Sequence, residues 1–335
     1  SEPGPACYGR GGTQPAVTDA NVVLGRIDPS RFAAGRVPLE PSRAHAALQE
    51  HIGDPLGMDA FWSAVGMSEV VEENMANAAR VHAIERGQDL DGFTMIAFGG
   101  GAPLHAGRLA QKLGIRRVLV PSGAGVGSAI GFLRAPISFE VVRSELMLVD
   151  RADPAAVDQR LRAMQAEAMA VVDPARGDAQ PTVTRLAELR YAGQGHELRV
   201  RLPGPDEGAI THATLAGLAE GFEQAYERVY GLRIPGSQVE VVTWSVTVAT
   251  PAAAAETASL APAPRLRAAE GTCDAWEPAA GERRAFGRHW RFDVAPGECL
   301  AGPALVMEHE TTVVVPAGWQ AQVDSHGHLR MEVAP

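Results

Sequence analysis

The 335-residue sequence has few cysteines: Cys7, Cys273 and Cys299 are the full set. They are odd in number, far apart and outside any CxxC arrangement, so they indicate neither a zinc site nor a disulfide framework. The simplest interpretation of this cysteine usage is a reducing, cytoplasmic compartment.

Long apolar runs and clustered basic residues are also missing. Apolar stretches such as residues 118–120 and 313–316 are far shorter than the roughly 20 residues that a membrane-spanning helix needs. The first residues lack a basic region followed by an apolar one. The formal net charge is −10, lysines are few and the arginines are scattered, which argues against a surface for nucleic-acid phosphates. We therefore expect neither a membrane nor a nucleic acid among the partners.

Hydrophobic residues make up 46% of the chain and charged residues 21%, enough for real cores in two or three domains. Helices and strands alternate in the first third, which is typical of an α/β layer. Residues 251–271 have the composition of an Ala/Pro-rich linker, and residues 285–333 are expected to close a small β-rich domain with 182–248. The patterns predict helices at 42–52, 61–86, 103–113, 154–172 and 214–230, and strands at 17–24, 94–98, 117–121, 182–191, 197–202 and 239–248.

The most informative segment is Thr94–Gly114, in which an apolar strand breaks into three glycines and continues as a helix. Gly99, Gly100 and Gly101 can adopt positive φ and let a ligand approach the backbone, and Pro103 fits the first helical turn. The N–H groups of that turn lack intrahelical partners and suit a phosphate or a ribose edge. The alternative is a tight turn that binds nothing.

A second glycine-rich segment, residues 122–131, contains a GxGxG string after a strand. A dinucleotide-binding fingerprint needs GxGxxG within a βαβ unit and an acidic residue about 20 positions later. The third glycine is wrongly spaced here, so the segment favours a helix of small residues packed closely against its neighbours.

Individual polar residues allow several interpretations. His105 could touch a nucleotide, orient the glycine turn or belong to a polar network. His326 with His328, and the segment 308–310, are interpreted as solvated surface groups. Asp19 and Asn21 are expected to hydrogen-bond nearby backbone. Cys7 is a weak candidate nucleophile, because no histidine lies near it in the sequence.

Four ordered segments carry a resemblance to a known family. Residues 2–26, with EPGPACYGRGG and VTDANVVLGR, and residues 97–106, AFGGGAPLHA, are similar to two signatures of the hydantoinase A/5-oxoprolinase family. Residues 189–198, LRYAGQGHEL, and 302–319 resemble its later segments. The family comprises subunits of ATP-dependent hydantoinases, oxoprolinases and ketone carboxylases. This sequence departs from the usual pattern, in which Gly and Ala alternate before Pro-Leu-His.

The resemblance implies an α/β fold: half of an acetate kinase/Hsp70/actin-like (ASKHA) nucleotide-binding fold, followed by a smaller β-rich carboxy-terminal domain. Family members carry two Asp-Gly-Gly-Thr phosphate loops upstream, whereas the nearest string here, Gly11–Thr13, follows Arg10. We therefore expect the carboxy-terminal half of a hydantoinase A type subunit, arising from a split gene, cleavage or truncation. The expected domains are residues 1–140, the ASKHA-like part; 141–180, a helical connector; and 181–335, the β-rich domain.

The resemblance also implies a function and a site. The complete enzyme would use ATP and Mg²⁺ to phosphorylate a small lactam or cyclic amide for ring-opening hydrolysis. This chain would supply the adenosine side of the ATP site through Gly99, Gly100, Gly101, Ala102 and His105. The missing half would hold most of the metal and the catalytic residues, so this chain alone is expected to be inactive. The alternatives are a fragment of an acetone- or acetophenone-type carboxylase, or a non-catalytic assembly module. The expected partners are the upstream half and a hydantoinase B type subunit, the latter at the β-rich region.

Overall fold

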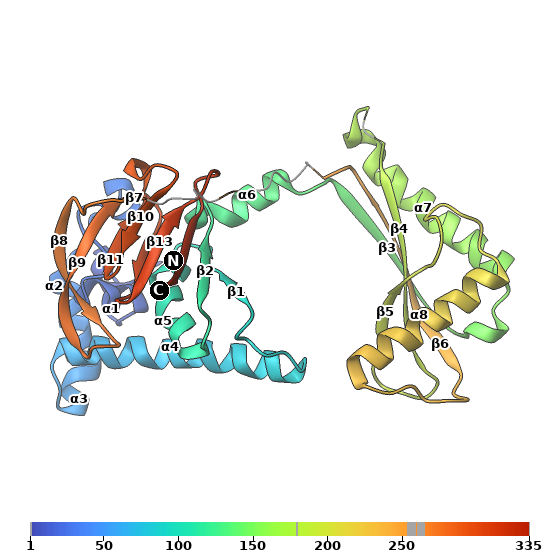
Figure 1. Cartoon of the computed structure of the whole chain (residues 1–335), viewed down its shortest axis with the longest axis horizontal. Coiled ribbons are helices and arrows are strands. Elements are labelled where there is room, and N and C mark those ends of the chain that lie inside the picture. The colour runs from blue at the N-terminus through green and yellow to red at the C-terminus, as the bar shows by residue number, and fades with distance from the viewer. Residues whose placement is uncertain (1, 179, 253–258, 260–264, 335) are drawn as a thin grey trace. The chain divides into compact units, whose positions relative to one another are not determined.

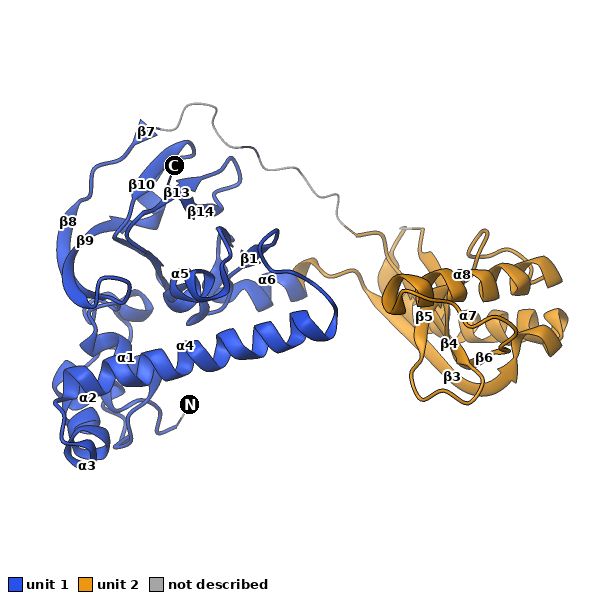
Figure 2. Ribbon diagram, turned by 60° about the horizontal axis from the view of Figure 1, so that its bottom comes forward, with its two compact units in different colours: residues 1–132, 256–335 blue, residues 133–255 orange. Residues whose placement is uncertain are grey.

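The chain forms two compact units in the computed structural model (Figure 2). Unit 1 comprises Ser1–Phe132 and Glu256–Pro335, and unit 2 comprises Leu133–Ala255. The structure describes residues 2–178, 180–252, 259 and 265–334. Most of the expected linker 251–271 lies outside the described residues. Its last part contains β7, and β8 begins at Gly271.

Unit 1 contains a six-stranded sheet and a four-stranded sheet (Figure 1). The first has the order β1-β2-β14-β13-β10-β7 and the second the order β12-β11-β9-β8. β1 and β2 are parallel, β14 is antiparallel to β2, and β11 is parallel to β9. The strands are β1 Thr94–Ile96, β2 Arg117–Val120, β7 Arg265–Leu266, β8 Gly271–Glu277, β9 Glu282–Trp290, β10 Glu298–Ala301, β11 Ala304–Met307, β12 Thr312–Val315, β13 Trp319–Val323 and β14 Leu329–Val333.

Strands from both ends of the chain share one core in unit 1. Met331 of β14 lies opposite Val118 of β2, and both side chains are buried. They pack in one cluster with Leu300, Val306 and further strand residues. The expectation that residues 285–333 close a domain with 182–248 is therefore wrong, and the compact units do not follow the expected boundaries at 140 and 180. Alternating hydrophobicity identifies a strand but does not say which strand it pairs with.

The helices of unit 1 position the glycine segment. The longest, α4, begins after Asp59, whose carboxylate accepts a hydrogen bond from the Trp62 N–H at 2.8 Å. It packs against α1 and α5, and α5 also packs against β12. The expected helices at 42–52, 61–86 and 103–113 are confirmed, the first with a π-helical turn at Gln49–Gly53. The helices are α1 Val17–Val23, α2 Pro41–Leu48, α3 Asp54–Leu56, α4 Ala60–Glu85, α5 Ala102–Leu113 and α6 Gly127–Arg134.

The strand expected at 17–24 is instead helix α1. Its β-branched residues favour a strand locally, but the fully buried Asp19 fixes a helix start. The Asp19 carboxylate accepts hydrogen bonds from the N–H groups of Ala6, Cys7 and Ala16 at 3.1, 2.7 and 2.8 Å. Two of these donors precede α1 by about ten residues, so tertiary hydrogen bonding overrides local propensity. The expected backbone-binding role of Asp19 is confirmed.

Replacing Asp19 by alanine is expected to lower the free energy of unfolding by about 2 kcal/mol or more, because buried N–H groups lose their acceptor. Asp19→Asn keeps one acceptor oxygen and should lose less. Chemical denaturation of the two variants and of the parent chain measures the difference. Equal stabilities of Asp19→Ala and the parent would contradict the anchoring role.

Unit 2 is an antiparallel sheet covered by two helices. Its strand order is β3-β6-β4-β5. Residues 183, 185, 187, 189 and 191 of β4 are buried in alternation, and apolar residues from the sheet and both helices form one core. The expected helices and strands of this region are confirmed. The elements are β3 Ser138–Leu148, α7 Pro154–Arg176, β4 Thr182–Tyr191, β5 Leu198–Arg201, α8 His212–Tyr230 and β6 Val239–Ala249. Among the described residues, no helix has both the length and the apolar character needed to cross a membrane.

Candidate functional site

The glycine turn joins the end of β1 to the start of α5. The Ala97 N–H still bonds to the Leu119 carbonyl at 2.9 Å, so the parallel pairing with β2 continues up to the turn. The Gly99 N–H then bonds to the Ala124 carbonyl at 2.7 Å. Gly99 has a φ of 108°, a conformation that favours glycine. Helix α5 starts after Gly101, and no side chain caps it. Pro103 has no N–H group and the Leu104 N–H bonds to the Gly101 carbonyl at 3.2 Å, so the N–H of Ala102 is the group of this first turn that is left for an external acceptor.

The glycines of the two glycine-rich segments serve different purposes. A Cβ atom on Gly99 or Gly101 would meet no described atom within 4 Å beyond its chain neighbours. By contrast, a Cβ on Gly125 would lie 2.4 Å from the Glu310 Cβ, and one on Gly127 would lie 3.2 Å from the Phe98 ring. Close packing therefore accounts for glycine at 125 and 127, as expected. Neither packing nor φ accounts for glycine at 101, which faces open space.

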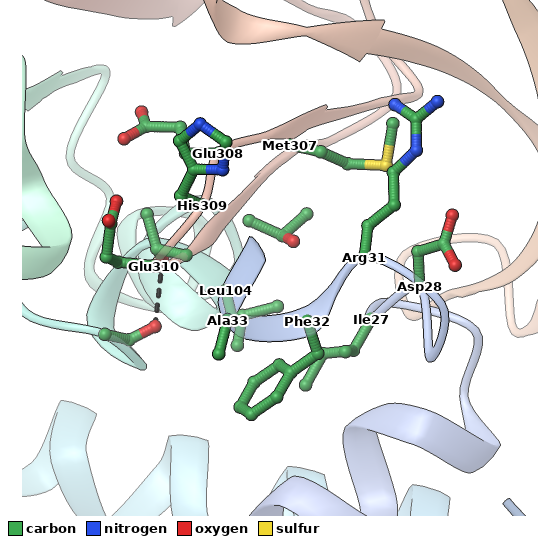
Figure 3. A pocket seen from close by; sticks show the side chains of 13 residues that line it. Ile27, Asp28, Arg31, Phe32, Ala33, Leu104, Met307, Glu308, His309 and Glu310 are labelled. Atoms are coloured by element: carbon green, nitrogen blue, oxygen red, sulfur yellow. Dashed lines mark hydrogen bonds between the residues drawn. The ribbon is translucent and has the colours of Figure 1, made fainter. Parts of the chain in front are cut away.

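A loop of the four-stranded sheet lies against the back of the turn. Thr311 Oγ1 donates a hydrogen bond to the Gly100 carbonyl at 2.9 Å. A small hollow of about 30 Å³ separates this loop from residues 27–33 and Leu104. That volume holds about two water molecules. Figure 3 shows Arg31 and Asp28 on one side of the hollow and His309 and Glu310 on the other. The contact with Gly100 fixes the position of the turn.

Charged side chains at the edge of this hollow are held in place by neighbouring residues. Arg288 Nη2 bonds to Asp28 Oδ2 at 2.6 Å, and the Arg31 guanidinium lies 5.4 Å from the centre of the Trp290 ring. Burial alone would raise the pKa of the Asp28 carboxyl, but its hydrogen bonds from Ser30 and the charge of Arg288 hold the pKa below its ordinary value. Asp28 therefore remains ionised and keeps Arg288 in place.

Glu308 is buried, although the sequence suggested a solvated strand edge. Only 5% of its surface is exposed, and its carboxylate lies 3.8 Å from the buried Arg291. Burial raises the pKa of Glu308 above its ordinary value, against the opposing charge of Arg291. An unbroken apolar run, residues 304–307, directly precedes Glu308. This run is the feature of the sequence that indicates burial of Glu308.

His105 belongs to a buried polar cluster below the glycine turn. Its Nδ1 lies 2.9 Å from Glu72 Oε1 and its Nε2 lies 3.2 Å from Asn21 Nδ2. Because Asn21 Oδ1 accepts a hydrogen bond from Arg26, the Asn21 amide N–H donates to His105 Nε2. His105 Nδ1–H then donates to Glu72. Both ring nitrogens are thus used inside the protein, which supports a positioning role for His105 over direct ligand contact.

Glu72 of α4 lies at the centre of this cluster, although the helical periodicity of residues 61–86 predicts it on the polar face of the helix. Glu72 is fully buried, with Arg26 Nη1 at 3.1 Å from its Oε1. Burial would raise the pKa of Glu72, but the hydrogen bond from His105 and the charge of Arg26 hold the pKa below its ordinary value. In the sequence, Glu72 has polar neighbours on the same helical face. Its partner Arg26 comes from another segment, and no local pattern indicates this pairing.

The remaining candidates carry no chemistry of their own. His328 Nδ1 accepts a hydrogen bond from the Ser122 N–H at 3.0 Å. The pKa of the Cys7 thiol is raised, mainly by burial and in addition by the neighbouring Asp19. The thiol therefore stays protonated, and Cys7 is a poor nucleophile. Within the part of the chain that the structure describes, no group of three or more His, Cys, Asp or Glu side chains is arranged to hold a metal ion.

Family models match nearly the whole chain. The hydantoinase/oxoprolinase model matches residues 1–141, and the hydantoinase/oxoprolinase C-terminal domain model matches residues 159–333. The chain belongs to the hydantoinase/oxoprolinase family. The resemblance of the four sequence segments is therefore confirmed.

Two curated relatives of this hydantoinase/oxoprolinase chain are named as subunits. It is 30% identical to the caprolactamase subunit alpha of Pseudomonas jessenii, over 97% of this chain and 47% of the relative. It is 29% identical to the acetophenone carboxylase gamma subunit of Aromatoleum aromaticum, over 99% of this chain and 46% of the relative. The chain spans about half the length of the curated relatives it matches.

A solved structure confirms the fold class of the hydantoinase/oxoprolinase chain. The crystal structure of the ATP-dependent caprolactamase from Pseudomonas jessenii matches with a TM-score of 0.75 and 29% identity. The match covers 100% of this chain and 49% of that chain. The expected mixed α/β fold is therefore present, with the β-rich carboxy-terminal strands built into unit 1.

Proposed function

We propose that this chain supplies the adenosine side of the ATP site in an ATP-dependent enzyme of its family. The observation that carries the proposal is Gly101, a glycine required by neither packing nor backbone conformation at the uncapped start of a 12-residue helix. Such a position lets the backbone N–H groups approach a polar ligand closely. The ATP-dependent caprolactamase, which shares the fold, supports ATP as that ligand.

The residues of this chain would position the nucleotide. Gly99, Gly100, Gly101 and Ala102 would face it through their backbone, while His105 holds the start of α5 through Glu72. ATP would supply the phosphoryl group that turns a carbonyl oxygen into a better leaving group. The residues that hold Mg²⁺ and carry out catalysis would belong mainly to the part of the family fold outside this chain.

For the substrate, we propose a small lactam or cyclic amide that is opened by hydrolysis. The similarity to a caprolactamase subunit supports this class. The similarity to an acetophenone carboxylase subunit supports ketone carboxylation as the second candidate. Both relatives are named as subunits, which supports assembly with a further subunit, and we propose a hydantoinase B type subunit for this role. The phosphate loops would belong to the part of the family fold that precedes the matched half. The three free cysteines support a cytoplasmic location.

Reconstitution tests the proposed function. This chain is co-expressed with the polypeptide of the same organism that carries the two Asp-Gly-Gly-Thr loops and with the hydantoinase B type subunit. We expect ATP hydrolysis that rises at least about tenfold with ε-caprolactam, 5-oxoproline or hydantoin, and that is absent with this chain alone. Stimulation only by acetone or acetophenone with bicarbonate would support the carboxylase. An assembly that neither binds nor hydrolyses ATP would favour a non-catalytic module.

A further inference from the structure

The peptide that joins Gly100 to Gly101 presents an N–H group at the start of α5. Gly101 has φ −102° and ψ −24°, close to helical geometry, so its N–H points out of the helix start in the same general direction as the N–H of Ala102. Within the described part of the chain, neither of these two N–H groups bonds to a protein acceptor. Both are therefore donors for the nucleotide in the proposed ATP site.

The carbonyl of the same peptide is held by a buried threonine. Thr311 Oγ1 donates a hydrogen bond to the Gly100 carbonyl at 2.9 Å, the dashed line of Figure 3, and only 7% of Thr311 is exposed. Because a peptide unit is planar and trans, its C=O and N–H groups point in opposite directions. A carbonyl directed at Thr311 therefore requires the Gly101 N–H to point away from Thr311, out of the start of α5.

Glycine on both sides leaves this peptide free to turn over. Neither Gly100 nor Gly101 has a Cβ atom, so φ and ψ on the two sides of the peptide are less restricted than in other residues. If the peptide plane turned over, the carbonyl oxygen would take the place of the N–H at the start of α5. An oxygen there would repel the acceptor atoms of a nucleotide. Only one of the two orientations can therefore bind the nucleotide, and the hydrogen bond from Thr311 favours that orientation.

The four-stranded sheet holds Thr311 at a fixed position relative to α5. Thr311 lies in the short loop between β11 and β12, and the Glu308 N–H closes this loop by a hydrogen bond to the Thr311 carbonyl at 2.8 Å. Strand β12 also packs against α5. This contact is close, because a Cβ atom on Gly107 of α5 would lie 2.9 Å from the Val314 carbonyl oxygen. The Thr311 hydroxyl and the start of α5 are thus parts of one packed structure.

We infer that Thr311 is a positioning residue of the ATP site, whose hydroxyl keeps the Gly100–Gly101 peptide in the orientation that directs its N–H to the nucleotide. This inference rests on the proposed function. Thr311 follows Gly100 by 211 residues and lies in the part of the chain matched by the C-terminal domain model, whereas the glycine turn lies in the part matched by the other model. Nucleotide binding by this chain would thus depend on both parts.

Removal of the hydroxyl tests the inference. Thr311→Val keeps the shape of the side chain and should weaken binding of a non-hydrolysable ATP analogue to the reconstituted enzyme roughly tenfold, because part of the molecules would then hold the peptide in the wrong orientation. Thr311→Ser keeps a hydroxyl and should bind within about threefold of the parent. The matched control is Thr312→Val, which makes the same change at the neighbouring residue, 8% exposed, and leaves the bond to Gly100 intact. Isothermal titration measures the affinities, and circular dichroism checks folding.

Steady-state kinetics separate positioning from a general loss of structure. Thr311→Val should raise the KM for ATP roughly tenfold and leave kcat within about twofold of the parent, since bound ATP itself holds the peptide in the right orientation. If Thr311→Val does not fold, Thr311→Ala replaces it, because alanine also lacks the hydroxyl. Parent-level affinity of the variant without the hydroxyl, or an equal loss in Thr311→Ser or Thr312→Val, would overturn the inference and leave the proposed function intact. If the parent enzyme does not bind the analogue, the proposed function fails instead.

Discussion

Valine at position 101 is expected to lower the affinity of the reconstituted enzyme for ATP by roughly 100-fold, which corresponds to about 2.7 kcal/mol. The valine side chain would fill the open space in front of the turn, so the nucleotide could no longer approach the backbone N–H groups. Folding should be almost unaffected, because φ at Gly101 is −102° and suits any residue. Isothermal titration with a non-hydrolysable ATP analogue measures the affinity.

The control for this variant is Gly195→Val in unit 2. Gly195 is exposed, and a Cβ there would also meet no described atom within 4 Å. It should bind the analogue like the parent enzyme. Gly100→Val is a less clean test, since its Cβ would lie 3.5 Å from the Glu310 carbonyl oxygen. An unchanged affinity of Gly101→Val would remove the glycine turn from the ATP site.

Glu72→Gln is expected to lower the free energy of unfolding by about 3 kcal/mol at neutral pH. The substitution removes the carboxylate that lies 3.1 Å from the buried Arg26, and an unpaired buried charge is strongly destabilising. The amide oxygen of the glutamine can still accept a hydrogen bond from His105, but without the negative charge this bond at the start of α5 is weaker. Urea denaturation of unit 1, followed by tryptophan fluorescence, measures the change.

The pH dependence of this effect follows from the pKa of Glu72. Because that pKa is lowered in the folded chain, the carboxylate stabilises the fold above its unfolded pKa of about 4.3. This stabilisation is lost as the pH falls through the folded pKa. The difference between parent and Glu72→Gln should therefore shrink below about pH 4. The exposed Glu73 provides the control, since Glu73→Gln breaks only solvated ion pairs with Arg80 and Lys112 and should change stability much less. Equal losses for both variants would contradict the buried cluster.

The sequence predicted the local structure around the candidate site well. Glycines between an apolar strand and a Pro-initiated helix produced β1, the turn and α5 close to their expected positions. Such features depend on neighbouring residues.

The predictions that were wrong all involve contacts between residues that are distant in the sequence. Asp19 imposes a helix on a β-branched segment through N–H groups of an earlier loop. Glu72 and Glu308 are buried because arginines from other segments accompany them.

The site residues Gly99, Gly100, Gly101, Ala102 and His105 remain a prediction from sequence to which the structure adds distinctions. It separates Gly101, which faces open space, from Gly100, whose carbonyl is bound by Thr311. It also shows why His105 could not be assigned from sequence alone. Its partners Asn21 and Glu72 lie 84 and 33 residues away, and no local pattern connects them.

The insertion of unit 2 into unit 1 determines an order of events during synthesis. β2 ends at Val120, but its neighbour β14 begins at Leu329, about 200 residues later. At 5–20 residues per second, the ribosome needs roughly 10 to 40 s to supply it. The four strands of unit 2 are synthesised within this interval. Unit 2 can therefore fold before the strand β14, which pairs with β2 in the sheet of unit 1, has been synthesised. Until β14 has been synthesised, Val118 and Val120 lack the strand that they pair with in the folded chain. We therefore expect this nascent chain to be prone to aggregation and to bind chaperones.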